Sequence, residues 1–101
     1  PNITPEKVVE VVAHHYDLSS EDLCGRSRTR AVALPRQLAM YLIRELTSAS
    51  LPRAGEALGG RDHTTVKHGC DKVGRLVKED TYLQRQASAI KEALYSPVSP
   101  R

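Results

Sequence analysis

The sequence is poor in aromatic side chains: its 101 residues include four tyrosines but neither tryptophan nor phenylalanine. Modules that bind single-stranded nucleic acids, such as RRM and OB folds, stack bases on several aromatic rings. This chain has too few rings for such a platform. Its two cysteines, Cys24 and Cys70, lie far apart without C-x-x-C spacing, so the sequence predicts neither a zinc site nor a disulfide framework.

Long hydrophobic runs are also missing. No uncharged run reaches the ~20 residues that a transmembrane helix needs, and the longest apolar stretch, residues 37–43, is bounded by Arg36 and Arg44. Residues 1–5 lack the basic region and apolar core of a signal peptide. We therefore expect no membrane insertion and a cytoplasmic location. Because residue 1 is proline and not methionine, we also expect a piece of a longer protein.

Charge is unevenly distributed along the chain. Fifteen Lys and Arg against twelve Asp and Glu give a net charge of +3. Residues 1–24 carry −4, residues 25–44 carry +5 without any acid, residues 45–60 carry −1, residues 61–78 carry +3, and residues 79–101 are neutral. Two basic segments in an otherwise acidic or neutral chain favour a polyanionic partner, although two solvated helix faces would give the same pattern.

Apolar residues recur at three- and four-residue steps, which predicts an all-α fold. No segment shows the sustained alternation of a strand. We expect helices at 5–16, at 19–24 as a single short turn, at 31–46, from 51 to just before Gly59, from 63 onward after an Asp62 cap, and across 83–94. These helices form one domain at residues 1–95, followed by a flexible tail at 96–101.

Residues 51–78 have the layout of a helix-turn-helix: a short helix, a glycine-bearing turn and a longer helix that begins with polar residues. In this motif the first residues of the second helix meet base edges in the major groove of DNA. Those residues here are Asp62, His63, Thr64 and Thr65. Their carboxylate, imidazole, hydroxyl and methyl groups suit base edges, although an ordinary capped surface helix would contain the same residue types.

Residues 25–30 form a second basic feature, the sequence Gly-Arg-Ser-Arg-Thr-Arg. Such extended arginine-bearing segments can enter the narrow minor groove of A·T-rich DNA. A solvated basic loop is the alternative. Arg36 and Gln37 lie in the first turns of the next helix, and Arg36 is expected away from the apolar stripe of that helix. Both are expected to donate to phosphates, which would position the domain without reading the DNA sequence.

The sequence also resembles a known family. The resemblance rests on the run Gly59-Gly60-Arg61-Asp62-His63-Thr64-Thr65-Val66 with His68 after it, on Pro35-Arg36-Gln37-Leu38-Ala39-Met40, and on Glu45-Leu46-Thr47 and Ser50-Leu51-Pro52. In order and spacing these segments resemble the C-terminal DNA-binding domain (domain IV) of the DnaA family of bacterial chromosomal replication initiators. The resemblance covers about residues 4–95, nearly the whole chain.

This resemblance implies a compact multi-helix domain with a helix-turn-helix of the Trp-repressor type and an added basic loop. It implies binding to short asymmetric DnaA boxes in double-stranded DNA at the replication origin, one copy per box, to help initiate and regulate chromosomal replication. The location would then be cytoplasmic and nucleoid-associated. The parent protein would self-assemble on the origin, and its ATP-binding and ATPase functions would belong to a domain upstream of this chain.

The resemblance further implies individual roles for residues of this chain. Arg28 corresponds to the arginine of the minor groove, and Pro52 to a residue near a thymine methyl. Asp62, His63, Thr64 and Thr65 correspond to the residues that read the major groove. The expected contacts to the DNA backbone are Arg30, Arg36, Gln37, Arg44, Leu51, Arg61, Lys67 and His68. Arg44 stands where other members often have lysine.

An enzyme is a poor match to this sequence. Asp62, His63 and Thr64 are adjacent, and neighbours on a helix do not face one another. His63 and His68 lack the i,i+4 spacing of a helical metal site, and no G-x-x-x-x-G-K-[ST] loop exists to hold ATP. We therefore expect no catalytic residue, metal or cofactor in this chain. An all-α protein-interaction module, using the acidic segment 1–24 or the final helix, is the alternative function.

Overall fold

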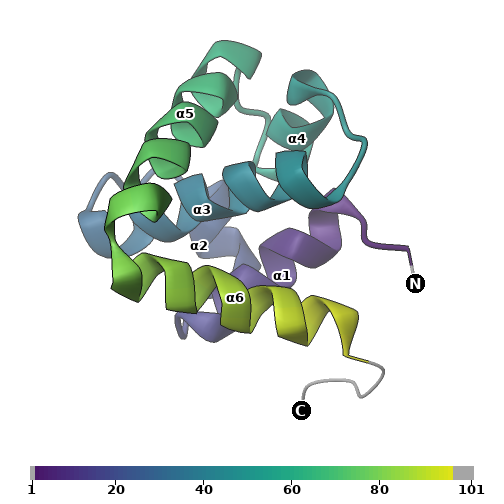
Figure 1. The fold of residues 1–101 in the computed structure, drawn as a ribbon. Coiled ribbons are helices and arrows are strands. Elements are labelled where there is room, and N and C mark those ends of the chain that lie inside the picture. Colours follow the sequence, from purple (N-terminus) through teal and green to yellow (C-terminus); the bar gives the residue numbers. More distant parts are fainter. Residues whose placement is uncertain (1, 97–101) are drawn as a thin grey trace.

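The computed structural model describes residues 2–96, which form six α-helices and no strand (Figure 1). The helices are α1 (Pro5–His15), α2 (Ser20–Cys24), α3 (Arg30–Leu46), α4 (Leu51–Ala57), α5 (His63–Glu79) and α6 (Thr81–Tyr95). The all-α prediction is confirmed, and the helix bounds lie close to the predicted ones. Of the predicted tail, only Ser96 belongs to the described residues, where it is the C-cap of α6.

Side chains cap the N-termini of five helices, which explains why the helices begin where they do. Thr4 accepts a hydrogen bond from the backbone N–H of Lys7, and Ser19 with Asp22 forms a reciprocal capping box at α2. Ser50, Asp62 and Asp80 cap α4, α5 and α6 in the same way. The first turn of α3 differs, because its N-cap, Thr29, makes no such side-chain bond.

Helix α3 lies at the centre of the fold, with α1 and α5 packed on it and α6 running along one side of the bundle (Figure 1). Leu38, Leu42 and Ile43 of α3 are fully buried. At Gly69 of α5 the two helices approach so closely that an added Cβ would collide with the sulfur of Met40. The position of α5 relative to α3 is therefore fixed by a tight contact between their surfaces.

Helices α4 and α5 form the helix-turn-helix, and the turn between them is tightly bonded. The carbonyl oxygen of Gly55 accepts hydrogen bonds from the backbone N–H groups of Gly60 and Arg61, at 2.9 and 3.0 Å. Gly59 and Gly60 both have positive φ, +79° and +81°, a conformation that favours glycine. These bonds and glycines set the direction in which α5 leaves the turn.

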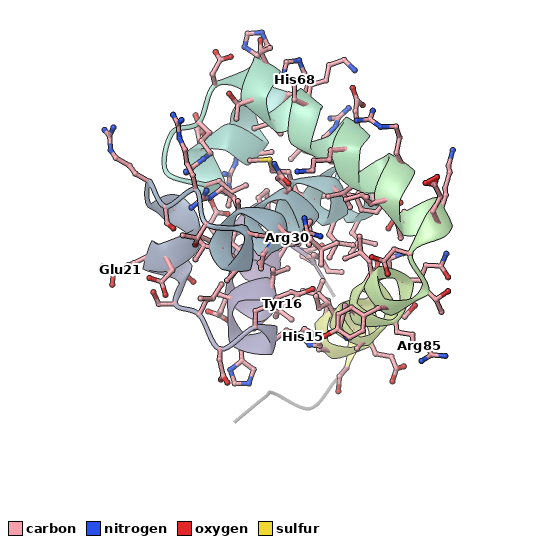
Figure 2. The ribbon with its side chains drawn as sticks, turned by 90° about the vertical axis from the view of Figure 1, so that its left-hand side faces the viewer. His15, Tyr16, Glu21, Arg30, His68 and Arg85 are labelled. Carbon is pink, nitrogen blue, oxygen red and sulfur yellow. The ribbon has the colours of Figure 1, made fainter. Side chains whose placement is uncertain are left out.

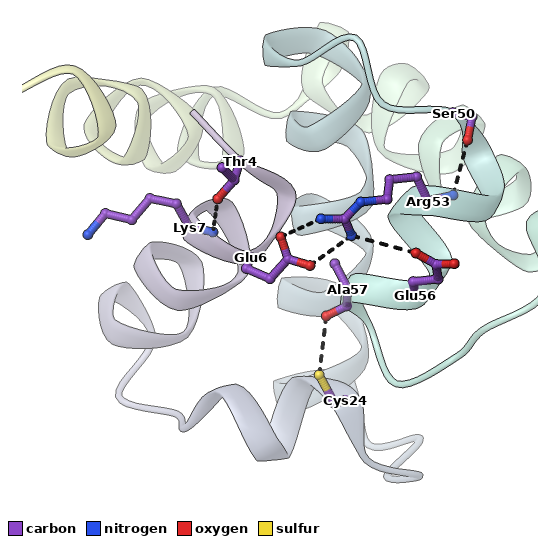
Figure 3. A network of polar contacts seen from close by, with 8 residues as sticks. All are labelled: Thr4, Glu6, Lys7, Cys24, Ser50, Arg53, Glu56 and Ala57. Carbon is purple, nitrogen blue, oxygen red and sulfur yellow. Dashed lines mark hydrogen bonds and ion pairs between the residues drawn. The ribbon is translucent and has the colours of Figure 1, made fainter. Parts of the chain in front are cut away.

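Figure 3 shows two of the contacts that attach the first half of the domain to the helix-turn-helix. The guanidinium of Arg53 on α4 donates two hydrogen bonds of 2.7 Å to the carboxylate of Glu6 on α1. The thiol of Cys24, at the end of α2, donates to the carbonyl oxygen of Ala57, with an Sγ···O distance of 3.4 Å. The residues that follow α2 therefore begin beside the end of α4.

Candidate nucleic-acid interface

An open groove of about 690 Å³ lies between the basic loop, residues 25–30, and helix α5. The charged residues that line it are Arg26, Arg28, Arg36, Arg61 and Lys72. No Asp or Glu of the described residues 2–96 is among its lining residues. The two basic segments predicted from the sequence are thus brought together on the two sides of one groove, where their charges reinforce one another.

The N-terminus of α5 presents the four predicted major-groove residues to solvent. Asp62, His63, Thr64 and Thr65 are all exposed, whereas Val66, the next residue, is fully buried. Thr65 lines the groove. This arrangement leaves the side chains 63–65 free to meet a ligand without disturbing the core.

Asp62 also stabilises α5 itself. Its Oδ2 accepts a hydrogen bond of 2.9 Å from the backbone N–H of Thr64. Hydrogen bonds from Thr64, aided by the neighbouring His63, lower the pKa of the Asp62 carboxyl. The residue is therefore a carboxylate at neutral pH. The oxygen lone pairs that the N-cap hydrogen bond does not use can accept a hydrogen bond from the amino group of a base.

The basic loop is exposed from Arg26 to Arg30, and it leads directly into α3. Within it the hydroxyl groups of Ser27 and Thr29 are hydrogen-bonded to each other, with 3.0 Å between Oγ and Oγ1, and the backbone N–H of Thr29 donates to Ser27 Oγ. The first turn of α3 contains no acidic residue and no side-chain cap. Its positive helix end adds to the attraction for an anion.

Arg36 is not where the sequence placed it. We expected it away from the apolar face of α3, but its side chain is buried, with 6% of the residue exposed. Its Nε donates to the carbonyl oxygen of Leu23 at 2.6 Å, Nη1 to that of Ser27 at 2.8 Å, and Nη2 to that of Asp22 at 3.2 Å. Burial, and then the charge of Arg61, lowers the pKa of Arg36. The expected exposed placement is therefore wrong.

Arg61, in the helix-turn-helix turn, has a similar environment. Its Nη1 donates to the carbonyl oxygens of Leu58 at 2.7 Å and Cys24 at 3.3 Å, and its Nη2 donates to that of Gly25. Burial lowers its pKa, although a guanidinium in this setting stays protonated. Both arginines therefore hold the start of the basic loop while contributing positive charge to the groove.

The other predicted contacts differ in their position relative to this groove. Gln37 lines it, and its buried Oε1 has no hydrogen-bond partner among the described residues, so the side chain can serve a phosphate only through Nε2. Arg44 is exposed and donates to the carbonyl oxygen of Ala49 at 2.8 Å, immediately before α4. Leu51 is half-buried and Pro52 exposed in the first turn of α4.

Lys67 and His68 are exposed on α5, as predicted. Lys67 forms an ion pair with Asp71, with 3.0 Å between Nζ and Oδ2. His68 points outward from α5 in Figure 2, at the opposite end of the molecule from His15 and Tyr16, which lie next to α6. The side chains of Lys67 and His68 are thus accessible on the surface of α5.

Lys72 lines the groove and is exposed. The sequence places it off the apolar stripe of α5, within reach of phosphates or solvent, but the set of predicted contacts did not include it. Lys72 lies seven residues after Thr65, and residues separated by two turns share one face of a helix. Arg26, in the basic loop, also lines the groove, although it was not among the predicted contacts.

Comparisons with known proteins agree with this geometry. The family model described as "Bacterial dnaA protein helix-turn-helix" matches residues 5–73, more than half of the chain. The chain belongs to the DnaA helix-turn-helix family. The chromosomal replication initiator protein DnaA of Lactobacillus delbrueckii subsp. bulgaricus is 50% identical over 88 residues, which cover 87% of this chain and 19% of that protein. The DnaA of Crocosphaera subtropica is 46% identical over 91 residues, which cover 90% of this chain and 20% of that protein.

The chain therefore spans about a fifth of the length of the DnaA relatives it matches. The matched region includes the basic loop, α3, the turn of the helix-turn-helix and the first part of α5, which together line the groove. None of the helices within residues 2–96 is long and apolar enough to cross a membrane.

Proposed function

We propose that this chain is the sequence-specific duplex-DNA-binding domain of a DnaA-type initiator and that it recognises a short, asymmetric box at a bacterial replication origin. Membership in the DnaA helix-turn-helix family supports this function. The groove carries it structurally, because five cationic side chains and no carboxylate of the described residues line one concave surface. Such a surface matches the phosphate backbone of nucleic acid.

The proposed binding mode uses two elements for the two grooves of DNA. The first turn of α5 enters the major groove, where the exposed side chains of His63, Thr64 and Thr65 meet base edges. The basic loop places Arg28 in the adjacent minor groove, whose negative potential is greatest in A·T-rich sequence. The strand backbone between the two grooves then faces the cationic groove of the protein.

The remaining predicted contacts position the domain on the DNA. Arg30, Gln37 and Arg44, with Leu51, Lys67 and His68, approach the backbone from both sides of α5, and Lys72 joins them. Pro52 packs against a thymine methyl at the start of α4. One copy occupies one box, and assembly of several copies on an origin is a property of the parent protein.

A selection from random-sequence duplexes at fixed salt concentration tests this function. The wild-type chain should enrich one short asymmetric consensus with an A·T-rich segment on one side. A parallel selection with Thr65→Ala should give a weaker base preference at the positions that α5 contacts in the major groove. A pool that stays random for the wild type would contradict the proposal and favour a protein-interaction module.

A further inference from the structure

Arg36 and Arg61 hold the same segment of main chain from two different elements. Arg36 comes from α3 and Arg61 from the turn of the helix-turn-helix. Between them they donate six hydrogen bonds, five of which go to backbone carbonyl oxygens of residues 22–27 and one to that of Leu58. The segment 22–27 joins the end of α2 to the basic loop. We call these two side chains with their six hydrogen bonds the arginine clamp.

The clamp occupies the space between the two elements that meet DNA in the proposed binding mode. Arg61 directly precedes Asp62 and the first turn of α5, and its acceptor Gly25 begins the basic loop. Arg36 holds the carbonyl oxygen of Ser27, which directly precedes Arg28. The position of Arg28 relative to α5 is therefore set through these two guanidinium groups.

Close packing reinforces this connection. The backbone of Gly59 lies so near the carbonyl oxygen of Cys24 that an added Cβ would collide with it. The thiol of Cys24 also donates to the carbonyl oxygen of Ala57. The end of α2 is thus attached to the turn of the helix-turn-helix at several points, and the basic loop leaves from a rigid base.

The chemistry of the clamp requires arginine. Each guanidinium presents donors in a planar fork, and here each one serves carbonyl oxygens on three different residues. Lysine has equal charge but a single ammonium nitrogen, and it cannot reproduce that geometry. A side chain that only attracted phosphates would tolerate lysine, because a phosphate is served by a point charge.

We propose that Arg36 and Arg61 are positioning residues that fix the distance between the minor-groove arginine and the major-groove helix, and so determine which spacing of the two parts of a DNA site the domain accepts. This inference rests on the proposed function. Neither guanidinium needs to touch a base for this role. Loss of the clamp should reduce the contribution of Arg28 without removing any DNA-reading side chain.

Charge-conserving variants test the clamp. Arg36→Lys and Arg61→Lys should each weaken binding to the selected duplex by about tenfold, a loss of the size of one good base contact. Adding Arg28→Ala to either variant should then reduce the affinity by less than about twofold. Arg28→Ala alone, in the wild type, should reduce the affinity by about tenfold. Arg85→Lys, an exposed arginine on α6, is the matched control and should bind as the wild type does.

A second duplex tests the spacing directly. One base pair inserted between the A·T-rich flank and the rest of the site shifts the flank by about 3.4 Å and about 35°. The wild type should bind this duplex at least about tenfold more weakly than the original, and the two lysine variants should discriminate between the duplexes by less than about threefold.

Hydrogen exchange separates loss of the clamp from loss of folding. The amides of residues 26–29 should exchange faster in Arg61→Lys, whereas those of residues 66–76 should keep their wild-type protection. Full wild-type affinity and spacing preference in both lysine variants would overturn the clamp and leave the proposed function intact. Absence of sequence preference in the wild type would instead overturn the proposed function.

Discussion

Glu6 on α1 and Arg53 on α4 form a two-bonded ion pair, in which both carboxylate oxygens of Glu6 accept from the guanidinium at 2.7 Å. The two residues are 47 positions apart in the sequence, so the pair connects the N-terminal helix to the first helix of the helix-turn-helix. The Nη1 atom of Arg53 also lies 3.9 Å from Oε1 of Glu56 (Figure 3). Because α4 leads into the turn, this pair supports the start of the helix-turn-helix.

The Glu6–Arg53 pair should make stability depend on pH. The hydrogen bonds from Arg53 lower the pKa of Glu6 below its ordinary value. The carboxyl group of Glu6 therefore has a lower pKa in the folded chain than in the unfolded chain. Its contribution to stability is fully present at pH values above the pKa of the unfolded chain, and it is lost as the pH falls through the pKa of the folded chain. Glu6→Gln should therefore lower the Tm at pH 7 and leave it unchanged at about pH 2. Thermal unfolding followed by circular dichroism measures both, and Glu92→Gln, on the exposed side of α6, is the control.

The turn glycines should differ in their tolerance of alanine. Gly60 has positive φ but open space around its Cβ position, so Gly60→Ala should cost only the left-handed backbone strain of about 1–2 kcal/mol. Gly59→Ala adds a collision with the carbonyl oxygen of Cys24 and should lower the free energy of unfolding clearly more than Gly60→Ala does. Urea unfolding of the two variants gives the comparison. Equal losses would mean that the turn and the end of α2 are not in close contact in solution.

The exposed first turn of α5 should control sequence preference and not stability. Thr65→Ala and His63→Ala should each lose about 1–3 kcal/mol of binding free energy on the selected duplex and much less on unrelated duplexes. Their Tm should stay near that of the wild type, since neither side chain is buried. Ser88→Ala on α6 is the control. Uniform weakening on all duplexes would assign these residues to the DNA backbone.

Arg28 should act through the A·T-rich flank of the site. Arg28→Ala should weaken binding to an A·T-flanked duplex by about 1–3 kcal/mol, because a narrow minor groove concentrates negative potential on an inserted arginine. A duplex with the same core and a G·C flank should be affected much less. Fluorescence anisotropy titrations measure binding to the two duplexes. Equal losses of binding free energy on both duplexes would contradict the placement of Arg28 in the minor groove.

Salt dependence should report the size of the cationic surface. If about 5–7 phosphates are neutralised, the logarithm of the affinity should fall with the logarithm of the salt concentration with a slope of about −5 to −6. Lys72→Gln should reduce the steepness by about 1, because this side chain lines the groove. Arg85→Gln removes the same charge from α6 and should leave the slope unchanged. A flat salt response of the wild type would contradict DNA binding through this surface.

The fold was largely predictable because local signals agreed with tertiary structure. Capping residues such as Thr4, Ser50 and Asp62 stand at the starts of helices in both the sequence and the structure. The spacing of the apolar residues gave the helical class, and the pair Gly59-Gly60 gave the position of the turn. These features depend on neighbours within a few residues, so one sequence contains them in full.

The placement of Arg36 was not predictable from one apolar stripe, because α3 is central and buried on more than one side. Ala39, Met40 and Ile43 lie three, four and seven residues after Arg36, on the same face of the helix, and all three are buried. That face suggests burial of Arg36, but only tertiary structure shows the carbonyl acceptors at 22–27. The groove likewise depends on the approach of segments far apart in the sequence.

The abrupt change from exposed to buried residues at the start of α5 has a consequence for how such domains can diverge. Residues 63–65 contribute nothing to the core, whereas Val66 is fully enclosed in it. In the proposed binding mode, substitutions at these three exposed positions would therefore change the preferred origin sequence while the same folded frame persists. An initiator and its boxes can in this way coevolve through a few surface positions, and the same positions offer a compact target for engineering new origin specificity.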